Sequence, residues 1–392
     1  MKKMLLVALV AVLGLAFTVP ASAFESEFGG YWRTRMFTND NFSGTDSDSS
    51  LDNSKIDTRT RLYYTAVLND NLKFVNKFEW DTTWGDNVGG DIGTDGKILE
   101  IKNSYVDATF GMVNAKIGQQ GLVLARGFIF DDDYSGINLT VAGATSLVYM
   151  KIDESDTTNM NDDNQAFVVA HAIKGDGFTV TPLALYADLE DSSYTYMIGV
   201  DVDANLGAAS VWGSFYYEGG NYDPTDVDQS AYLLAVGGNV NLSDMVGLHG
   251  QVFYASGDDD PTDDDAEAWT EVGGQSYYWS EIMGFGVFDD VVSNGSPADK
   301  VSNITAINLG TTIKASEKLS FDADVWYAML AEDDVNGEDY LGTEIDLKAT
   351  YMLIDGLKLE VIAAYLFAGD ATYNGSDDDD PLEFGTQLSL SF

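Results

Sequence analysis

The chain has 392 residues, and its 64 acidic residues outnumber its 20 basic residues, which gives a formal net charge of −44. This charge excludes nucleic acid as a partner, because binding to phosphates requires a positive surface. The absence of cysteine excludes disulfides, thiol catalysis and Cys-based zinc sites. With 12% aromatic residues, 39 glycines and only 6 prolines, the composition favours strands and tight turns over helices.

Residues 1–23 have the three-part order of a secretory signal peptide: lysines, an apolar run over residues 4–19, and Ala21-Ser22-Ala23. A membrane-anchor helix is the alternative, but an apolar core of about 16 residues is short for a spanning helix. No later run is apolar enough to span a bilayer as a helix. We therefore predict cleavage before Phe24, export through the inner membrane, and a mature chain over residues 24–392.

The last segment of the chain alternates strictly between apolar and small polar residues and ends on Phe392. Half-buried strands of soluble proteins also alternate. The terminal aromatic residue, however, resembles the C-terminal insertion signal that the barrel-assembly machinery recognises in outer-membrane proteins. The sequence therefore predicts a bacterial outer-membrane barrel in contact with outer-membrane lipid and lipopolysaccharide.

The same period of two recurs along the chain, and charge occupies only one parity of each strand. The pattern predicts an all-β fold: one transmembrane antiparallel up-and-down β-barrel domain of about 18 strands, with 16 as the alternative. Connections alternate between short turns, expected in the periplasm, and longer acidic loops, expected outside the cell. The strands are expected to begin near residues 27, 56, 72, 98, 113, 134, 145, 164, 177, 193, 207, 229, 245, 301, 318, 339, 356 and 381.

All five arginines lie in the first third of the chain. The parity of the first three strands places the arginines of residues 33–61 and two lysines on the lumen face, because arginine in the middle of the bilayer costs about 2 to 4 kcal/mol. We interpret them as a pore-lining basic patch: Arg33, Arg35, Arg59, Arg61, Lys73 and Lys77.

Later strands carry charged residues on the same lumen parity: Asp322, Asp324, Glu344, Asp346 and Lys348. Facing the basic patch, these carboxylates would set a transverse field of the kind that selects ions. The alternative is that all of these charges only solvate a polar lining.

Two loops are candidates for narrowing the pore. Residues 121–133 contain Arg126 and the run Asp131, Asp132 and Asp133. We expect this segment to form either an inward constriction or an external hairpin. Residues 257–300 form the longest insertion and predict an external cap or an inward-folded loop.

The sequence offers little for catalysis. His171 and His249 lie in separate predicted strands, and neither accompanies a nucleophile motif. The acidic runs lack the calcium-loop spacing, so solvated loops are favoured over ordered calcium sites. We predict no enzyme activity, no cofactor and no metal site.

The paired arginines of the first two strands, the segments 118–120 (Gly-Gln-Gln) and 341–347, and Ala368-Gly369-Asp370 resemble the alginate-export type of outer-membrane porins. The resemblance implies an 18-stranded barrel. Gln119 stands where that family has arginine, which favours a general porin over an exporter of alginate.

Three functional classes remain open. The first is a water-filled porin for passive diffusion of ions and small hydrophilic solutes, because about 18 strands leave an aqueous lumen. The second is a selective channel or exporter for an anionic polysaccharide or a small anion. The third is a surface adhesin or barrel enzyme. The sequence leaves both a monomer and a homotrimer open.

Overall fold

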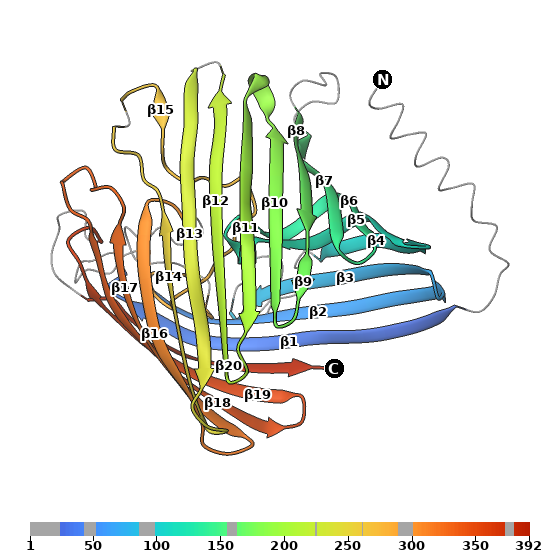
Figure 1. Ribbon diagram of the computed structural model, residues 1–392. Helices are drawn as coiled ribbons and strands as arrows, with labels where there is room; N and C mark the ends of the chain where they lie inside the picture. Colours follow the sequence, from blue (N-terminus) through green and yellow to red (C-terminus); the bar gives the residue numbers. More distant parts are fainter. Residues whose placement is uncertain are drawn as a thin grey trace.

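The protein is an all-β closed barrel, described here from a computed structural model (Figure 1). The structure describes residues 24–42, 52–85, 99–154, 163–223, 226–260, 262–288, 301–372 and 380–392. The expected signal peptide, residues 1–23, lies outside this part of the chain. Among the described residues, no helix is long and apolar enough to cross a membrane.

The first half of the wall runs from blue to green in Figure 1. Its strands are β1 (Glu25–Asp40), β2 (Asn53–Asn69), β3 (Leu72–Thr83), β4 (Glu100–Phe110), β5 (Val113–Leu124), β6 (Phe130–Val141), β7 (Thr145–Glu154), β8 (Asp163–His171), β9 (Ile173–Gly175) and β10 (Phe178–Asp188).

The second half continues from green to red. Its strands are β11 (Tyr194–Asn205), β12 (Ala209–Tyr222), β13 (Val227–Asn241), β14 (Val246–Ala255), β15 (Asp265–Ala266), β16 (Ile304–Lys314), β17 (Leu319–Leu330), β18 (Tyr340–Ile354), β19 (Leu357–Ala368) and β20 (Leu382–Ser391). Two short 3-10 turns, η1 (Ala125–Gly127) and η2 (Glu190–Ser192), lie in connections.

These segments make a wall of 18 antiparallel strands. β8 and β9 are one strand interrupted at Ala172, since both pair with β10, and the two-residue β15 pairs parallel with β13 from within a loop. Each wall strand pairs with its sequence neighbour, and β1 also pairs with β20, which closes the barrel. The predicted 18-stranded antiparallel barrel is confirmed, with strand starts displaced by at most four residues, at β6.

The closure also involves the C-terminus. The backbone of Phe392 exchanges two hydrogen bonds with Gly30 of β1, at 2.8 and 3.2 Å. A Cβ at Gly30 would lie 2.5 Å from the Phe392 ring, so glycine is required for the ring to approach this strand. The terminal aromatic residue is thus part of the seam, and its side chain is 64% exposed on the outside of the barrel.

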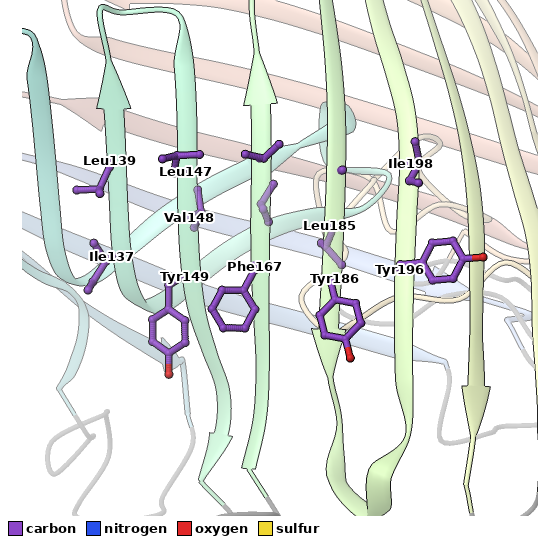
Figure 2. A pocket seen from close by; sticks show the side chains of 13 residues that line it. Ile137, Leu139, Leu147, Val148, Tyr149, Phe167, Leu185, Tyr186, Tyr196 and Ile198 are labelled. Carbon is purple, nitrogen blue, oxygen red and sulfur yellow. The ribbon is translucent and has the colours of Figure 1, made fainter. Parts of the chain in front are cut away.

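The outer face is apolar and carries rows of aromatic side chains. Tyr149, Phe167, Tyr186 and Tyr196 are successive cross-strand neighbours on β7, β8, β10 and β11 and form one row, with aliphatic side chains such as Leu147 beside them (Figure 2). Aromatic girdles around an apolar band are typical of barrels that face lipid.

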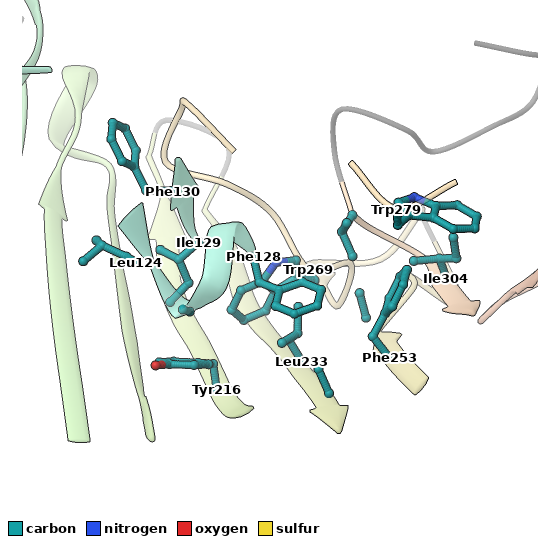
Figure 3. Close-up of a cluster of buried hydrophobic side chains, with 14 of the residues drawn as sticks. Leu124, Phe128, Ile129, Phe130, Tyr216, Leu233, Phe253, Trp269, Trp279 and Ile304 are labelled. Atoms are coloured by element: carbon teal, nitrogen blue, oxygen red, sulfur yellow. The ribbon is translucent and has the colours of Figure 1, made fainter. Parts of the chain in front are cut away.

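The buried core lies inside the barrel. Large apolar side chains from the wall, such as Phe253 and Leu233, pack against Phe128 and Trp269 from two loops (Figure 3). All four are fully buried. The short turns leave one end of the barrel compact, whereas the two loops that carry the core enter from the opposite end.

Candidate functional site: the constricted lumen

The first constricting element is the β5–β6 hairpin, whose strands pair as far as Leu124 and Phe130. Its tip, residues 125–129, carries the fully buried Phe128 and Ile129. Ala125 and Arg126 have φ values of 49° and 60°, a left-handed conformation that costs non-glycine residues about 1 to 3 kcal/mol each. Phe128 contacts Phe253 of β14, on a distant part of the wall, so the tip reaches into the lumen.

Arg126 holds the hairpin tip to the wall. Its guanidinium donates a 2.6 Å hydrogen bond to Asp203 of β11 and lies 4.7 Å from the ring centroid of Trp212 on β12. Ion pairing and cation–π contact therefore act together on one side chain. The sequence indicated Arg126, but neither Asp203 nor Trp212, because the partners lie more than 75 residues away.

The acidic run of the hairpin lies elsewhere. Asp133 forms a 3.3 Å ion pair with Lys102 and accepts a 2.6 Å hydrogen bond from Asn103, both on β4. Asp131 and Asp132 are exposed. The structure thus separates Arg126 from the three aspartates that the sequence grouped with it.

The second constricting element is the connection between β14 and β16, residues 256–303, of which 262–288 and the flanks are described. Thr270 donates to the buried Glu218 of β12 through its backbone N–H at 2.9 Å and its hydroxyl at 2.6 Å. Further along, Phe288 stacks on Phe37 of β1 at 4.8 Å. The loop therefore contacts inward-facing residues on distant wall strands, which places it inside the barrel.

The two loops also bind each other. Gln275 donates to the carbonyl of Phe128 at 2.6 Å, and the N–H of Asp131 donates to the carbonyl of Gly274 at 2.8 Å. Phe128 and Tyr277 stack with centroids 3.8 Å apart. We therefore treat the hairpin tip and the long loop as one plug that narrows the lumen.

The predicted basic residues lie on three adjacent strands, and within the described residues Arg35, Arg59 and Arg61 form ion pairs with carboxylates of a neighbouring strand. Arg59 binds Asp81 through Nε at 2.8 Å and Nη2 at 2.6 Å, and Arg61 pairs with Glu79. Lys77 is half-buried and lies within electrostatic range of Asp133, while Lys73 is exposed and Arg33 sits opposite Arg59 in the register.

Arg35 differs from its neighbours because it is only 5% exposed. It makes a bidentate pair with Asp57, at 2.9 and 2.6 Å. It also donates to the carbonyls of Val287 at 2.9 Å and Phe288 at 2.6 Å. Its role here is to hold the long loop against β1. The sequence missed the carboxylates that partner these arginines, although Asp57, Glu79 and Asp81 share their parity.

The opposing residues lie together on β17 and β18, where Asp322 faces Lys348 and Asp324 faces Asp346 across the strands. Lys348 is 3.9 Å from Asp322, and Asp324 accepts hydrogen bonds from His249 at 2.7 Å and Asn308 at 3.0 Å.

Glu344 is fully buried beneath the long loop and does not line open lumen. Its carboxylate accepts the backbone N–H groups of Ile282 at 2.7 Å and Met283 at 2.9 Å and the hydroxyl of Ser280 at 3.0 Å. The expectation that Glu344 faces the basic patch across the pore fails here, because the loop folds over it.

Comparison with solved structures finds outer-membrane proteins of the Occ/OprD type. OccK11 (OpdR) of Pseudomonas aeruginosa has a TM-score of 0.63 at 13% identity, covering 96% of this chain and 99% of that chain. OccAB4 of Acinetobacter baumannii has a TM-score of 0.61 at 12% identity, with coverages of 94% and 98%. OpdK of P. aeruginosa, solved with vanillate, has a TM-score of 0.62 at 10% identity, with coverages of 94% and 100%.

No protein-family model matches the chain, and no curated protein matches it. The alginate-export resemblance is therefore not confirmed, and the comparisons support instead the fold of the Occ/OprD barrels. At these identities the shared property is the 18-stranded barrel.

Proposed function

We propose that the protein is an outer-membrane porin that lets ions and small hydrophilic solutes diffuse passively through a constricted, water-filled lumen. The observation that carries this proposal is the closed 18-stranded wall with charged residues on its inner face. Barrels of about this size leave an aqueous channel unless loops narrow it. The apolar outer face with its aromatic row supports placement in a bilayer.

The plug sets the size of solute that this porin admits. The hairpin tip and the long loop place apolar side chains such as Phe128 and Trp269 inside the barrel. Export of an anionic polysaccharide such as alginate is the weaker alternative, because no family model supports it and the similar solved structures are Occ/OprD barrels. Export by the signal peptide and insertion guided by Phe392 belong to the same proposal.

A channel selective for small anions is the second candidate. It is favoured by the arginines and lysines that the structure places side by side on β1, β2 and β3. The barrel of OpdK, which was solved with vanillate, has the same fold. In this reading Arg33, Arg59, Arg61 and Lys77 attract the anion, and their carboxylate partners moderate the field.

Planar-bilayer recording tests both candidates. We expect stepwise, ohmic conductance from the purified protein, and the reversal potential in a salt gradient reports ion preference. The double variant Arg59→Gln/Arg61→Gln removes two cations from the wall and should shift that potential toward cations. Bilayers that stay closed would exclude the porin, and an unchanged reversal potential would exclude the basic wall from selectivity.

A further inference from the structure

A hollow of about 570 Å³ lies on the outer face of the wall, between β6 and β11 (Figure 2). The aromatic row described above forms its rim on the side of the long loops. The next row toward the short turns is aliphatic, and its members are successive cross-strand neighbours: Leu139, Leu147, Val169, Ala184 and Ile198. Apart from the tyrosine hydroxyls, the side chains that line the hollow are apolar.

Ala184 lowers the floor of this hollow. It lies between Val169 of β8 and Ile198 of β11 in the register, and its methyl group is the smallest side chain of the aliphatic row. Side chains on a strand stand roughly perpendicular to the sheet, so the outer surface is lower at Ala184 than at its two neighbours. An apolar hollow of this kind does not hold ordered water, which suits it to a hydrocarbon chain.

A polar residue interrupts the apolar face on the short-turn side of the hollow. His171 lies two residues beyond Val169 on β8, about 7 Å along the strand, and its side chain is exposed on the same outer face. Ile173 follows at the next outward position and is 50% exposed, so apolar side chains flank His171 in both directions. Ionisable residues in an apolar membrane band are rare and costly, and they indicate a functional site with a polar partner.

The wall supplies a partner for one nitrogen of the imidazole. Thr145 lies opposite His171 in the register, and its hydroxyl is 2.8 Å from Nδ1. When this hydroxyl donates to Nδ1, the ring proton is on Nε2, which becomes a donor. Within the described residues, no group accepts a hydrogen bond from Nε2. The ring can therefore donate to a group outside the barrel.

We propose that this face binds a phospholipid, with a phosphate oxygen accepting the hydrogen bond of His171 Nε2 and with an acyl chain in the hollow. A hydrogen bond to an anionic oxygen is stronger than one to a neutral acceptor. The site lies beside the short turn at 142–144, which places the lipid in the periplasmic leaflet. The inference rests on the placement in a bilayer proposed above and does not require conduction.

Three ligands test the site on the detergent-solubilised protein: dioleoylphosphatidylglycerol, dioleoylglycerol and inorganic phosphate. Titrations followed by native mass spectrometry should show a phosphatidylglycerol that stays bound to the barrel at low lipid concentration. Dioleoylglycerol has the same chains without the phosphate and should bind at least about tenfold more weakly, the factor expected for losing a charged hydrogen bond. Inorganic phosphate should not displace the lipid, because it gains nothing from the hollow. Equal affinity for dioleoylglycerol, or displacement by equimolar phosphate, would overturn the proposal.

Two variants of His171 test the contact with the phosphate. His171→Leu removes the donor and suits a lipid-facing position, so it should lower the affinity for phosphatidylglycerol about tenfold, to the value for dioleoylglycerol, without destabilising the barrel. His171→Gln keeps an N–H donor and should retain most of the affinity. Unchanged affinity in His171→Leu, with urea unfolding showing an intact barrel, would overturn the assignment.

A second pair of variants tests the hollow. Ala184→Trp places an indole on its floor and should weaken the binding of both lipids. Val236→Trp adds the same ring at an outward position of β13 that is 53% exposed, and it is the matched control. Equal lipid affinities in these two variants would overturn the proposal. A dimer that Ala184→Trp abolishes would do the same, because a second copy of the chain would then occupy the hollow.

Conductance separates this proposal from the porin. If bilayers stay closed while phosphatidylglycerol binds and His171→Leu weakens it, the porin proposal fails and this one stands. If the protein conducts while both His171→Leu and Ala184→Trp keep the original lipid affinity, this proposal fails and the porin stands.

Discussion

Two arginine–aspartate pairs on neighbouring strands have the same chemistry and different surroundings. Arg35 with Asp57 joins β1 to β2 through two hydrogen bonds, and Arg59 with Asp81 joins β2 to β3 through three. The side chains of the first pair are 6% and 11% exposed, and those of the second are 22% and 50% exposed. Arg35 also binds the backbone of the long loop, at Val287 and Phe288.

The difference shows that burial by a loop, and not residue type, decides whether a charged residue in this lumen has a structural role or stays accessible to ions. Water screens the Arg59 pair and leaves it available to passing ions. The loop desolvates the Arg35 pair, which makes each of its hydrogen bonds structural. Both arginines carry the same sequence signal, since each lies on the lumen parity of its strand.

Replacing each arginine by methionine gives the largest expected contrast. Arg35→Met leaves Asp57 buried and unpaired, which should destabilise the barrel by about 3 to 5 kcal/mol. Arg59→Met breaks an exposed pair and should cost about 0 to 1 kcal/mol. Urea unfolding in lipid vesicles measures both.

The same two variants should differ in bilayers. Arg35→Met releases the carbonyls of Val287 and Phe288, so its single-channel current should become larger and noisier, whereas Arg59→Met should change ion preference without added noise. Equal stabilities for the two variants would contradict a structural role for Arg35.

A third ion pair, Arg126 with Asp203, is partly exposed and yet holds a loop. Asp203→Asn should weaken the contact by about 1 kcal/mol or less, with the Trp212 contact retained. We expect more frequent current fluctuations at high salt, because salt screens the remaining contacts of the Arg126 guanidinium. Asp355→Asn, in the exposed turn between β18 and β19, is the control. Identical current noise in both variants would show that the pair does not hold the tip.

The smallest effect concerns pH. Burial raises the pKa of Glu281 to about 7, although the hydrogen bond from Val287 opposes the shift. Glu344 and Glu360 raise this pKa further, and Lys348 lowers it. The neutral form is therefore favoured when the loop is seated, so this stabilisation is complete below the ordinary glutamate pKa and is lost as pH rises through about 7.

Channel noise should accordingly increase modestly between pH 5 and 8. Glu281→Gln mimics the neutral form and should remove this dependence, whereas Glu317→Gln, in an exposed turn, should retain it. A pH dependence that survives in Glu281→Gln would assign it to another group.

The wall was predictable because the alternation that defines its two faces is visible within each strand of the sequence. Alternation along each strand, as in Phe321, Asp322, Ala323, Asp324 and Val325, separates the lipid-facing side from the lumen side residue by residue. Turn residues such as those at 142–144 then locate each reversal. The predicted start of β6 was the least accurate, because the β5–β6 pairing continues inward beyond the wall.

The interior was only partly predictable. Arg126 and the long loop were recognised as candidates, but the sequence left inward and outward folding open for both. The decisive contacts, Arg126 with Asp203 and Glu344 with the backbone of Ile282 and Met283, join segments more than 60 residues apart. Backbone N–H groups carry no residue-specific signal, so no pattern could have indicated that Glu344 would accept them.

The sequence by itself determined the barrel, a strand number of about 18 and the side of the wall on which each charge lies, because a period of two encodes the two faces of a strand directly. Only the tertiary structure decided which of those charges stay accessible to solutes. That outcome depends on where two loops fold in three dimensions, and desolvation by a loop changes the role of an arginine or a glutamate without changing its position on the wall.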